Sequence, residues 1–344
     1  MGGIMNEGIR FYCGIGEKQW NWWPVAPGPD ACISPVYGNS TASKEINSVR
    51  VPEGVQVIQD SGAFSDGPGQ RLNFADALKR QERHAERYGY TEQIEARASY
   101  DLLIDEMWDE AEGSSAVYRR AKRRWSETQA ELAVQETIAA ARFLSAHRNG
   151  LPCILSAQGV SPQQYRRCAE KVVPLMQDGD LFGLGGWCIT GKFPAQMLPV
   201  FRETMYSVIP FLGNEGIKRV HIWGVCFAPA LGELLWLCDQ HGIALSTDSM
   251  GPSVRPAMGR WGYGDWTDTS YRSAPSLKPE EAHETCMVKS WAVKAIEVAW
   301  ARGAHRAAHV NLVRTWLKYF RYTDYYPKAT PLYLARPHQL QLAM

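Results

Sequence analysis

Short apolar runs alternate with helix-like stretches along most of this chain of 344 residues, and this alternation constrains the fold more than any other feature. Strands that alternate with helices form parallel sheets. The sequence predicts eight such strands, and eight is the number that closes a (β/α)8 barrel of the TIM type. An open, doubly wound sheet would give a similar pattern. The predicted strands are 9–13, 32–36, 55–59, 99–104, 153–157, 181–185, 219–223 and 243–246.

The segments between and after these strands predict helices and a two-part organisation. Residues that favour helices are abundant in 115–147, and Ser161 before Pro162 predicts an N-cap with proline at the first helical position. Residues 251–280 show no period and predict a long loop. We therefore expect a barrel over 1–278, with an aromatic N-terminal loop, and a C-terminal helical subdomain over 279–344. The predicted helices before that subdomain are 74–88, 115–147, 162–173, 194–209 and 229–241.

Composition narrows the classes of function. The net charge is +1, so any binding of nucleic acid must come from local clusters of basic residues. The chain has no apolar stretch of membrane-spanning length, and its eight cysteines lie scattered without a CxxC pair, which favours reduced thiols. We expect a cytoplasmic protein without a membrane partner. No glycine-rich phosphate loop of a standard kind is present, so no organic cofactor is expected.

Two aspartates follow two of the predicted strands. Asp60 comes directly after 55–59, and Asp248 follows 243–246. Two carboxylates at strand ends supply what a double displacement at a sugar carbon needs, one as the nucleophile and one as the acid and base. Either aspartate alone is better explained as a helix N-cap or a turn residue. The pair, together with the residues that follow the other strands, favours a catalytic interpretation.

Other polar residues end the remaining strands, and in a barrel these ends open onto one face. Asp101 and Asp105 lie on the same side of a strand with a period of two. Gln158 follows the strand 153–157, and a pair of glycines follows the next one. A carboxylate, an amide and exposed glycine backbone suit guanine, which offers ring N–H and amino donors and a carbonyl acceptor. The sequence therefore predicts a purine pocket at this face.

The order of these motifs resembles that of the tRNA-guanine transglycosylases and their DNA-acting relatives. The matching residues extend from Asp60 to Arg255 and so cover most of the predicted barrel. No single motif is specific, but six occur in the family's order. The stretches Gly-Leu-Gly-Gly-Trp-Cys and Thr-Asp-Ser-Met are more similar to the DNA 7-deazaguanine transglycosylases (DpdA) of bacteria and phages. The six motifs are Asp60-Ser-Gly-Ala-Phe, Ile104-Asp-Glu, Ala157-Gln-Gly, Gly185-Gly, Trp223-Gly-Val and Thr247-Asp-Ser-Met.

The resemblance implies an exchange of guanine in DNA for a 7-deazaguanine, such as 7-cyano-7-deazaguanine, in a bacterial cell or a phage-infected host. Asp248 would attack the sugar C1′ and form a covalent glycosyl-enzyme. Asp60 would protonate the departing guanine and then deprotonate the incoming base. The substrate-binding residues that the resemblance implies are Asp105, with Asp101 as its rival, Gln158, Gly185, Gly186, Trp187, Trp223 and Ser61.

The resemblance also raises the question of a structural zinc ion. The tRNA enzymes hold zinc with three cysteines and a histidine, but the cysteine triplet is missing here. The comparable pattern is His283 and Cys286, followed by His309 after 22 intervening residues, with Glu281 as the fourth ligand. The alternative is an ordinary helix N-terminus after Pro279, where acidic residues complement the helix dipole.

Three alternatives to a DNA-modifying enzyme remain at this point. A tRNA-acting enzyme is disfavoured by the missing cysteine triplet. A non-catalytic nucleic-acid-binding subunit of the same fold is disfavoured because both aspartates are present. An unrelated barrel hydrolase requires the order of the motifs to be a coincidence. Basic residues in 118–125 and 302–321 are candidates for phosphate contacts or for ordinary solvated faces, and the oligomeric state stays open.

Overall fold

Eight parallel strands form a closed barrel in which each strand pairs with the next and β8 pairs with β1. The predicted barrel is thereby confirmed. The structure, a computed structural model, describes residues 9–15, 30–36, 51, 54–66, 71–102, 104, 126–188, 194–225, 228–249, 260–261 and 272–273. The barrel strands are β1 (Ile9–Ile15), β2 (Ala31–Ile33), β3 (Val57–Gln59), β4 (Ile94–Ala98), β5 (Cys153–Ala157), β6 (Leu181–Leu184), β7 (Arg219–Ile222) and β8 (Ala244–Ser249).

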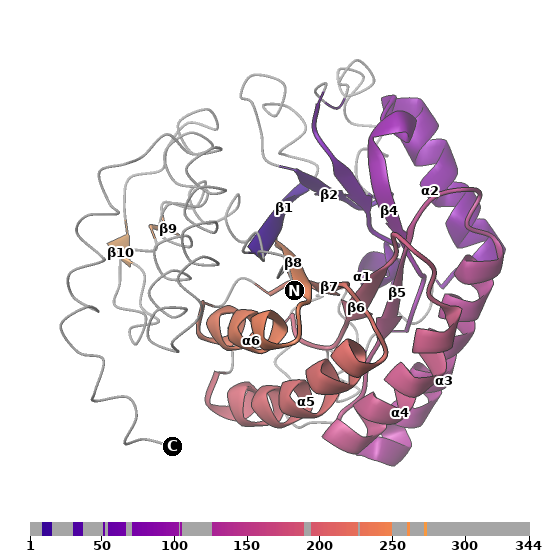
Figure 1. The fold of residues 1–344 in the computed structure, drawn as a ribbon. Helices are drawn as coiled ribbons and strands as arrows, with labels where there is room; N and C mark the ends of the chain where they lie inside the picture. The colour runs from indigo at the N-terminus through magenta and orange to yellow at the C-terminus, as the bar shows by residue number, and fades with distance from the viewer. Residues whose placement is uncertain are drawn as a thin grey trace.

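The larger helices cover the outside of the barrel, and Figure 1 shows α2 to α6 in sequence order around strands β3 to β8. Short 3-10 turns at Thr91–Gln93 and Val173–Leu175 lead out of α2 and α4. The strands β9 (Arg260–Trp261) and β10 (Arg272–Ser273) form a separate antiparallel pair. The helices are α1 (Ala63–Asp66), α2 (Phe74–Tyr88), α3 (Glu127–Ala146), α4 (Pro162–Val172), α5 (Pro194–Asn214) and α6 (Ala228–Gln240).

Capping residues set the ends of these helices. The Asn73 side chain accepts the backbone N–H of Asp76 at the start of α2, and Gly89 ends that helix with a φ of 67°, a left-handed conformation that glycine adopts without strain. Ser126 and Gln129 form a reciprocal capping box, so α3 begins at Glu127. The predicted helix 115–147 is therefore confirmed for its second part, while its first residues lie outside the described residues.

One predicted strand is wrong: the pattern placed a strand at 99–104, whereas β4 runs from Ile94 to Ala98. The pairing of β3 with β4 shifts between Val57 and Ile58, so that Glu95 is an extra residue in the register. Such a bulge interrupts the alternation of apolar and polar side chains on which the sequence prediction depends. Glu95 and Arg97 also place two charged residues in this strand of five, so the apolar pattern expected of a barrel strand is missing from its sequence.

The barrel interior differs from the layer outside it. Inside, a compact cluster packs beneath Trp223, and it includes small residues such as Ala96 and Ala98. The larger core lies between the strands and the surrounding helices, with residues such as Phe182, Phe201 and Leu234 fully buried. Burial of this second layer supplies most of the hydrophobic stabilisation, since that stabilisation scales with the apolar area removed from water. Within the described residues, no helix combines the length and the apolar character needed to cross a membrane.

Candidate functional site

Asp248 lies inside β8 rather than beyond its end, because that strand extends to Ser249 and not only to the predicted Ser246. Its side chain is 15% exposed. Oδ1 accepts the backbone N–H of Gly224 at 2.8 Å and lies 3.2 Å from Nε2 of His221. Among the described residues, Oδ2 has no hydrogen-bond partner. Two neighbours therefore anchor one oxygen of this carboxylate.

His221 on β7 is the side chain that contacts Asp248, and it is completely buried. Its Nδ1 lies 3.0 Å from the hydroxyl of Ser246, which itself donates to the carbonyl oxygen of Val220 at 3.2 Å. The rings of Trp223 and Tyr12 meet the imidazole edge-on at centroid distances of 4.4 and 5.9 Å. Packing and hydrogen bonds thus fix both the position and the orientation of the ring.

Gly224 has a backbone conformation that other residues adopt only with strain. Its φ is 68°, and a Cβ at this position would lie 2.4 Å from Sγ of Cys188. The left-handed turn directs the N–H of Gly224 at Asp248 immediately after β7 ends. A glycine is therefore required at this position for the anchoring of Asp248.

Asp60 follows β3, and its backbone N–H continues the strand ladder by donating to the carbonyl oxygen of Ile33 at 2.9 Å. Burial raises the pKa of this carboxyl, and the negative charge of Asp248 raises it further. Backbone N–H groups of Ser61, at 2.8 Å, and of Gly62 oppose this rise. The Ser34 hydroxyl also opposes it from nearby, although its oxygen lacks a partner of strict hydrogen-bond geometry.

The raised pKa has two meanings for the site. It reflects the position of both carboxyls at the carboxyl ends of β3 and β8, on the same face of the barrel, where the charge of Asp248 acts on Asp60. It also means that Asp60 keeps its proton to a higher pH than an ordinary aspartate does. A protonated carboxyl beside an ionised one is the arrangement in which one group is an acid and the other is a nucleophile.

Two residues of α2 hold the loop that carries Asp60. Gln81 donates to the carbonyl oxygen of Asp60 at 3.0 Å, and Arg80 donates to that of Ser61 at the same distance. Arg80 is in turn paired with Asp66 at 2.7 Å. The side chain of Ser61 is buried, and its oxygen accepts the N–H of Ala63. Ser61 therefore shapes the turn, and its backbone supports Asp60.

Gln158 is completely buried, and its amide is already engaged. Its oxygen accepts the N–H of Ile104 at 3.2 Å, and its nitrogen donates to the carbonyl oxygen of Leu102 and to the hydroxyl of Thr137. These bonds tie the chain after β4 to β5 and α3. In this arrangement Gln158 positions the segment that carries Asp101, and a base could reach its amide only by displacing those partners.

The remaining predicted pocket residues lie in two places, at the carboxyl-end side of the barrel and in the layer between the strands and the helices. Trp223 spans the barrel interior, where its indole N–H donates to Ser156 at 2.9 Å. Gly185 and Gly186 follow β6, and the N–H of Gly185 donates to the carbonyl oxygen of Ala157 at 3.0 Å. Trp187 is only 1% exposed, and its ring packs against aromatic side chains of α4 and α5, so it lies in the layer between strands and helices.

Asp101 is buried at the end of the segment after β4, and its backbone oxygen accepts a hydrogen bond from Arg71 at 3.0 Å. Burial, and to a smaller extent the charge of Asp101, raises the pKa of Cys168 on α4 to about 12. The carboxyl therefore lies close to α4. Its rival Asp105 falls outside the described residues, so the choice between them stays open.

The predicted zinc ligands, Glu281, His283, Cys286 and His309, also lie outside the described residues, as do the aromatic N-terminal loop, the basic stretch 118–125 and the subdomain 279–344. Within the described part of the chain, no group of three or more His, Cys, Asp or Glu side chains is arranged to hold a metal ion. The prediction of a zinc site therefore stays a prediction.

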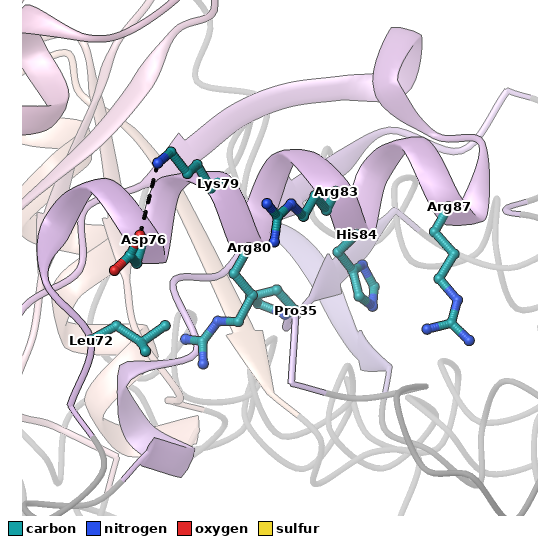
Figure 2. A pocket seen from close by; sticks show the side chains of 8 residues that line it. All are labelled: Pro35, Leu72, Asp76, Lys79, Arg80, Arg83, His84 and Arg87. Carbon is teal, nitrogen blue, oxygen red and sulfur yellow. Dashed lines mark ion pairs between the residues drawn. The ribbon is translucent and has the colours of Figure 1, made fainter.

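A basic groove of about 540 Å³ lies along α2, and Figure 2 shows the side chains that line it. Lys79, Arg83 and Arg87 are exposed and spaced four residues apart, so they share one face of the helix. Asp76 supplies a weak ion pair to Lys79 at 3.9 Å. Arg80 connects this groove to the candidate site, because it also supports the loop of Asp60. We refer to this surface as the α2 groove.

The residues that the sequence analysis did not select act on the aspartates rather than on a ligand. His221, Gly224, Ser246 and Ser34 contact or influence the two carboxyls. A signal for two of them was present, because His221 and Gly224 belong to the stretch that ends β7. The sequence did not reveal that these two residues contact Asp248. Which residues of neighbouring strands face each other depends on the register of the sheet, and the register is set only in the folded barrel.

No protein-family model matches the sequence, and no curated protein matches it significantly. Among solved structures, the chain is similar in outline to one described as a fructose-1,6-biphosphate aldolase from Coccidioides immitis, with 12% identity, 94% of each chain covered and a TM-score of 0.37. So distant a likeness carries no argument about activity. The barrel is established by the pairing of its own strands.

Proposed function

We propose that this protein is a glycosyltransferase that exchanges guanine in DNA for a 7-deazaguanine base, through a sugar bound covalently to Asp248. The observation that supports the proposal is the pairing of Asp60 and Asp248 at one end of the barrel. Burial and mutual repulsion favour the protonated form of Asp60, while two neighbours anchor one oxygen of Asp248. An acid and a nucleophile are the two groups that such an exchange requires.

The proposed first displacement uses both groups at once. Oδ2 of Asp248 attacks C1′ of the target nucleotide, and the bond from C1′ to N9 of guanine breaks. The electron pair of that bond leaves with guanine, which takes the proton of Asp60 as it departs. The enzyme then holds the sugar as an ester of Asp248, and Asp60 is ionised. Guanine leaves as a neutral base, and the single negative charge of the aspartate pair moves from Asp248 to Asp60.

The second displacement reverses these roles. The ionised Asp60 takes the proton from N9 of the incoming 7-deazaguanine, and this nitrogen attacks C1′. The bond from C1′ to Oδ2 breaks, and its electron pair restores the carboxylate of Asp248. The configuration at C1′ is retained after two inversions, and no net proton or electron is consumed. Water in place of the base would give hydrolysis, the outcome expected of an unrelated barrel hydrolase.

The α2 groove is the described surface whose chemistry best suits the phosphates of a nucleic acid. Lys79, Arg83 and Arg87 succeed one another at about 6 Å along the helix axis, and a basic track of this kind follows a flexible backbone. Reaching C1′ requires the target nucleotide to leave the base stack or to lie in a single strand. A single strand that reaches the Asp60 loop along α2 satisfies both needs.

The decisive experiment is a covalent trap. The purified protein is incubated with single-stranded DNA that contains labelled guanine, then denatured, and the protein is analysed for an attached strand by mass spectrometry. We expect an adduct on the peptide that contains Asp248, and none with Asp248→Asn. Released guanine together with incorporated 7-cyano-7-deazaguanine identifies a transferase, and release without incorporation identifies a hydrolase. A wild-type protein that binds DNA without adduct or release would overturn the proposal in favour of a binding subunit.

A parallel incubation with tRNA separates the two nucleic-acid substrates. We expect incorporation into DNA and not into tRNA under the same conditions. Incorporation into tRNA alone would replace the DNA assignment by that of a tRNA-guanine transglycosylase. Metal analysis of the same preparation tests the predicted zinc site, for which about one equivalent per chain is expected.

A further inference from the structure

His221, Ser246 and the carbonyl group of Val220 form a hydrogen-bonded chain that ends at Asp248. The ring is fully buried between β7 and β8, and its two nitrogens face different partners. Nδ1 faces the Ser246 hydroxyl, and Nε2 faces Oδ1 of Asp248. The uncharged rings of Trp223 and Tyr12 pack edge-on against the imidazole.

The proton on Nε2 follows from its partner. A carboxylate oxygen only accepts hydrogen bonds, so Nε2–H donates to Oδ1 of Asp248 at 3.2 Å. The Ser246 hydroxyl lies 3.0 Å from Nδ1 and 3.2 Å from the carbonyl oxygen of Val220, and it bonds the ring from the other side. Oδ1 also accepts the N–H of Gly224, so two donors are directed at this one oxygen.

We infer that His221 is a positioning residue that donates from Nε2 to Oδ1 of Asp248 and so reserves Oδ2 for attack on the sugar. This inference rests on the proposed function of Asp248 as the nucleophile. The two donors at Oδ1 restrict the rotation of the carboxylate and leave Oδ2 as the oxygen that they do not engage. In the glycosyl-enzyme, Oδ1 becomes the carbonyl oxygen of the ester and keeps both donors. When the bond from C1′ to Oδ2 breaks, the returning charge is stabilised by the same groups.

The kinetic test compares two substitutions of His221. Gln, whose amide can reach the position of Nε2, preserves a donor to Oδ1, whereas Phe fills the space without one. We expect His221→Phe to lower kcat for guanine release by about 10²–10³-fold, as the loss of one such donor does elsewhere, with KM nearly unchanged. His221→Gln should recover most of that loss. A kcat for His221→Phe within about threefold of the wild type, or equal losses in the two variants, would overturn the inference.

A second measurement does not depend on activity. Histidine labelled with nitrogen-15 in the full-length protein reports by NMR which ring nitrogens carry protons. We expect one histidine, identified by its loss in His221→Gln, to carry a proton on Nε2. In Asp248→Ala the resonance of this N–H should shift, because its acceptor is gone. A ring that carries its proton on Nδ1 alone in the wild-type protein would refute the inference.

The two measurements also separate this inference from the proposed function. If the wild-type protein forms no adduct and releases no guanine, the proposed function fails whatever the NMR spectra show. If the protein is active but Nε2 of His221 carries no proton, or His221→Phe is fully active, the proposed function stands and the role of His221 fails.

Discussion

The two ends of the barrel interior differ in how their charged side chains are paired. At the amino ends of the strands, Arg10 and Arg219 surround Glu95, and Arg10 also pairs with Asp30 at 2.8 Å. Two cations and two anions are matched there, and Tyr12 donates to Glu95 at 2.7 Å. At the carboxyl ends, the charge of Asp248 acts against ionisation of Asp60, and the basic side chain that the described residues place beside them is His221, 3.2 Å from Asp248.

This difference indicates what each end contributes. A matched network offsets the cost of taking charges out of water and so serves the fold. Two like charges held together raise that cost, and the barrel tolerates it because the surrounding core stabilises the fold. Functional groups are found where the local arrangement is unfavourable for stability. We therefore expect variants at the carboxyl ends of the strands to change activity, and variants at the amino ends to change stability.

Asp248→Asn should remove the activity and leave the fold intact. We expect guanine release to fall by at least about 10³-fold, because the amide is a poor nucleophile and cannot form the ester. The melting temperature should change by only a few degrees. Guanine release is measured with labelled DNA. The matched control is Asp178→Asn, which changes an exposed aspartate between α4 and β6. Guanine release near the wild-type rate would mean that Asp248 is not the nucleophile and that the carboxyl ends of the strands do not hold the catalytic groups.

Glu95→Ala should have the opposite profile. It removes the shared partner of Arg10, Arg219 and Tyr12, and it leaves Arg10 with Asp30 alone and Arg219 without its described carboxylate partner. We expect a loss of about 2–3 kcal/mol in the free energy of unfolding, measured by urea denaturation, with activity per folded molecule nearly unchanged. Glu170→Ala breaks an exposed pair with Arg166 and should cost less than about 0.5 kcal/mol. Equal losses of unfolding free energy in the two variants would show that the network around Glu95 stabilises the protein no more than an exposed ion pair does.

Neutralising the α2 groove should weaken DNA binding without affecting the chemical step. We expect the combined change of Lys79, Arg83 and Arg87 to Gln to reduce the slope of log K against log salt by about 2–3, one unit for each lost phosphate contact. Binding is measured by fluorescence anisotropy with a labelled single strand. The same substitutions at Arg142, Arg167 and Lys171, on α3 and α4, form the control. An identical slope in both triple variants would remove the groove from the binding surface.

Asp60→Asn should stabilise the protein slightly near neutral pH. The pKa of Asp60 is raised in the folded state, so the wild-type protein binds this proton more tightly when folded and loses stability as the pH rises through that pKa. Asn carries no charge at any pH, and the variant should melt a few degrees higher than the wild type at neutral pH. Below the ordinary pKa of aspartate the difference should shrink. Thermal melts across this pH range check the sign, and a less stable variant at neutral pH would contradict it.

The sequence predicted those elements best whose local pattern is complete. The bounds of α2 and β5 agree with the prediction, because α2 has a capping residue at one end and a glycine at the other, and β5 is a continuous apolar run. β4 was misplaced because its bulge and its two charged residues hide the period of a strand. Both catalytic candidates were found from their positions at strand ends. His221 was passed over because its partner lies on another strand.

The sequence by itself determined parallel strands that alternate with helices, compatible with a barrel or an open sheet, and the strand ends to which Asp60 and Asp248 belong, since hydrophobic period and strand direction are local properties of the chain. Only the tertiary structure decided that the two carboxyls interact, that Asp60 favours its protonated form, and that Gly224 and His221 hold one oxygen of Asp248. The physical reason is that pKa and hydrogen bonding depend on burial and on distances between strands. These quantities are set when the sheet closes and have no counterpart in the order of residues.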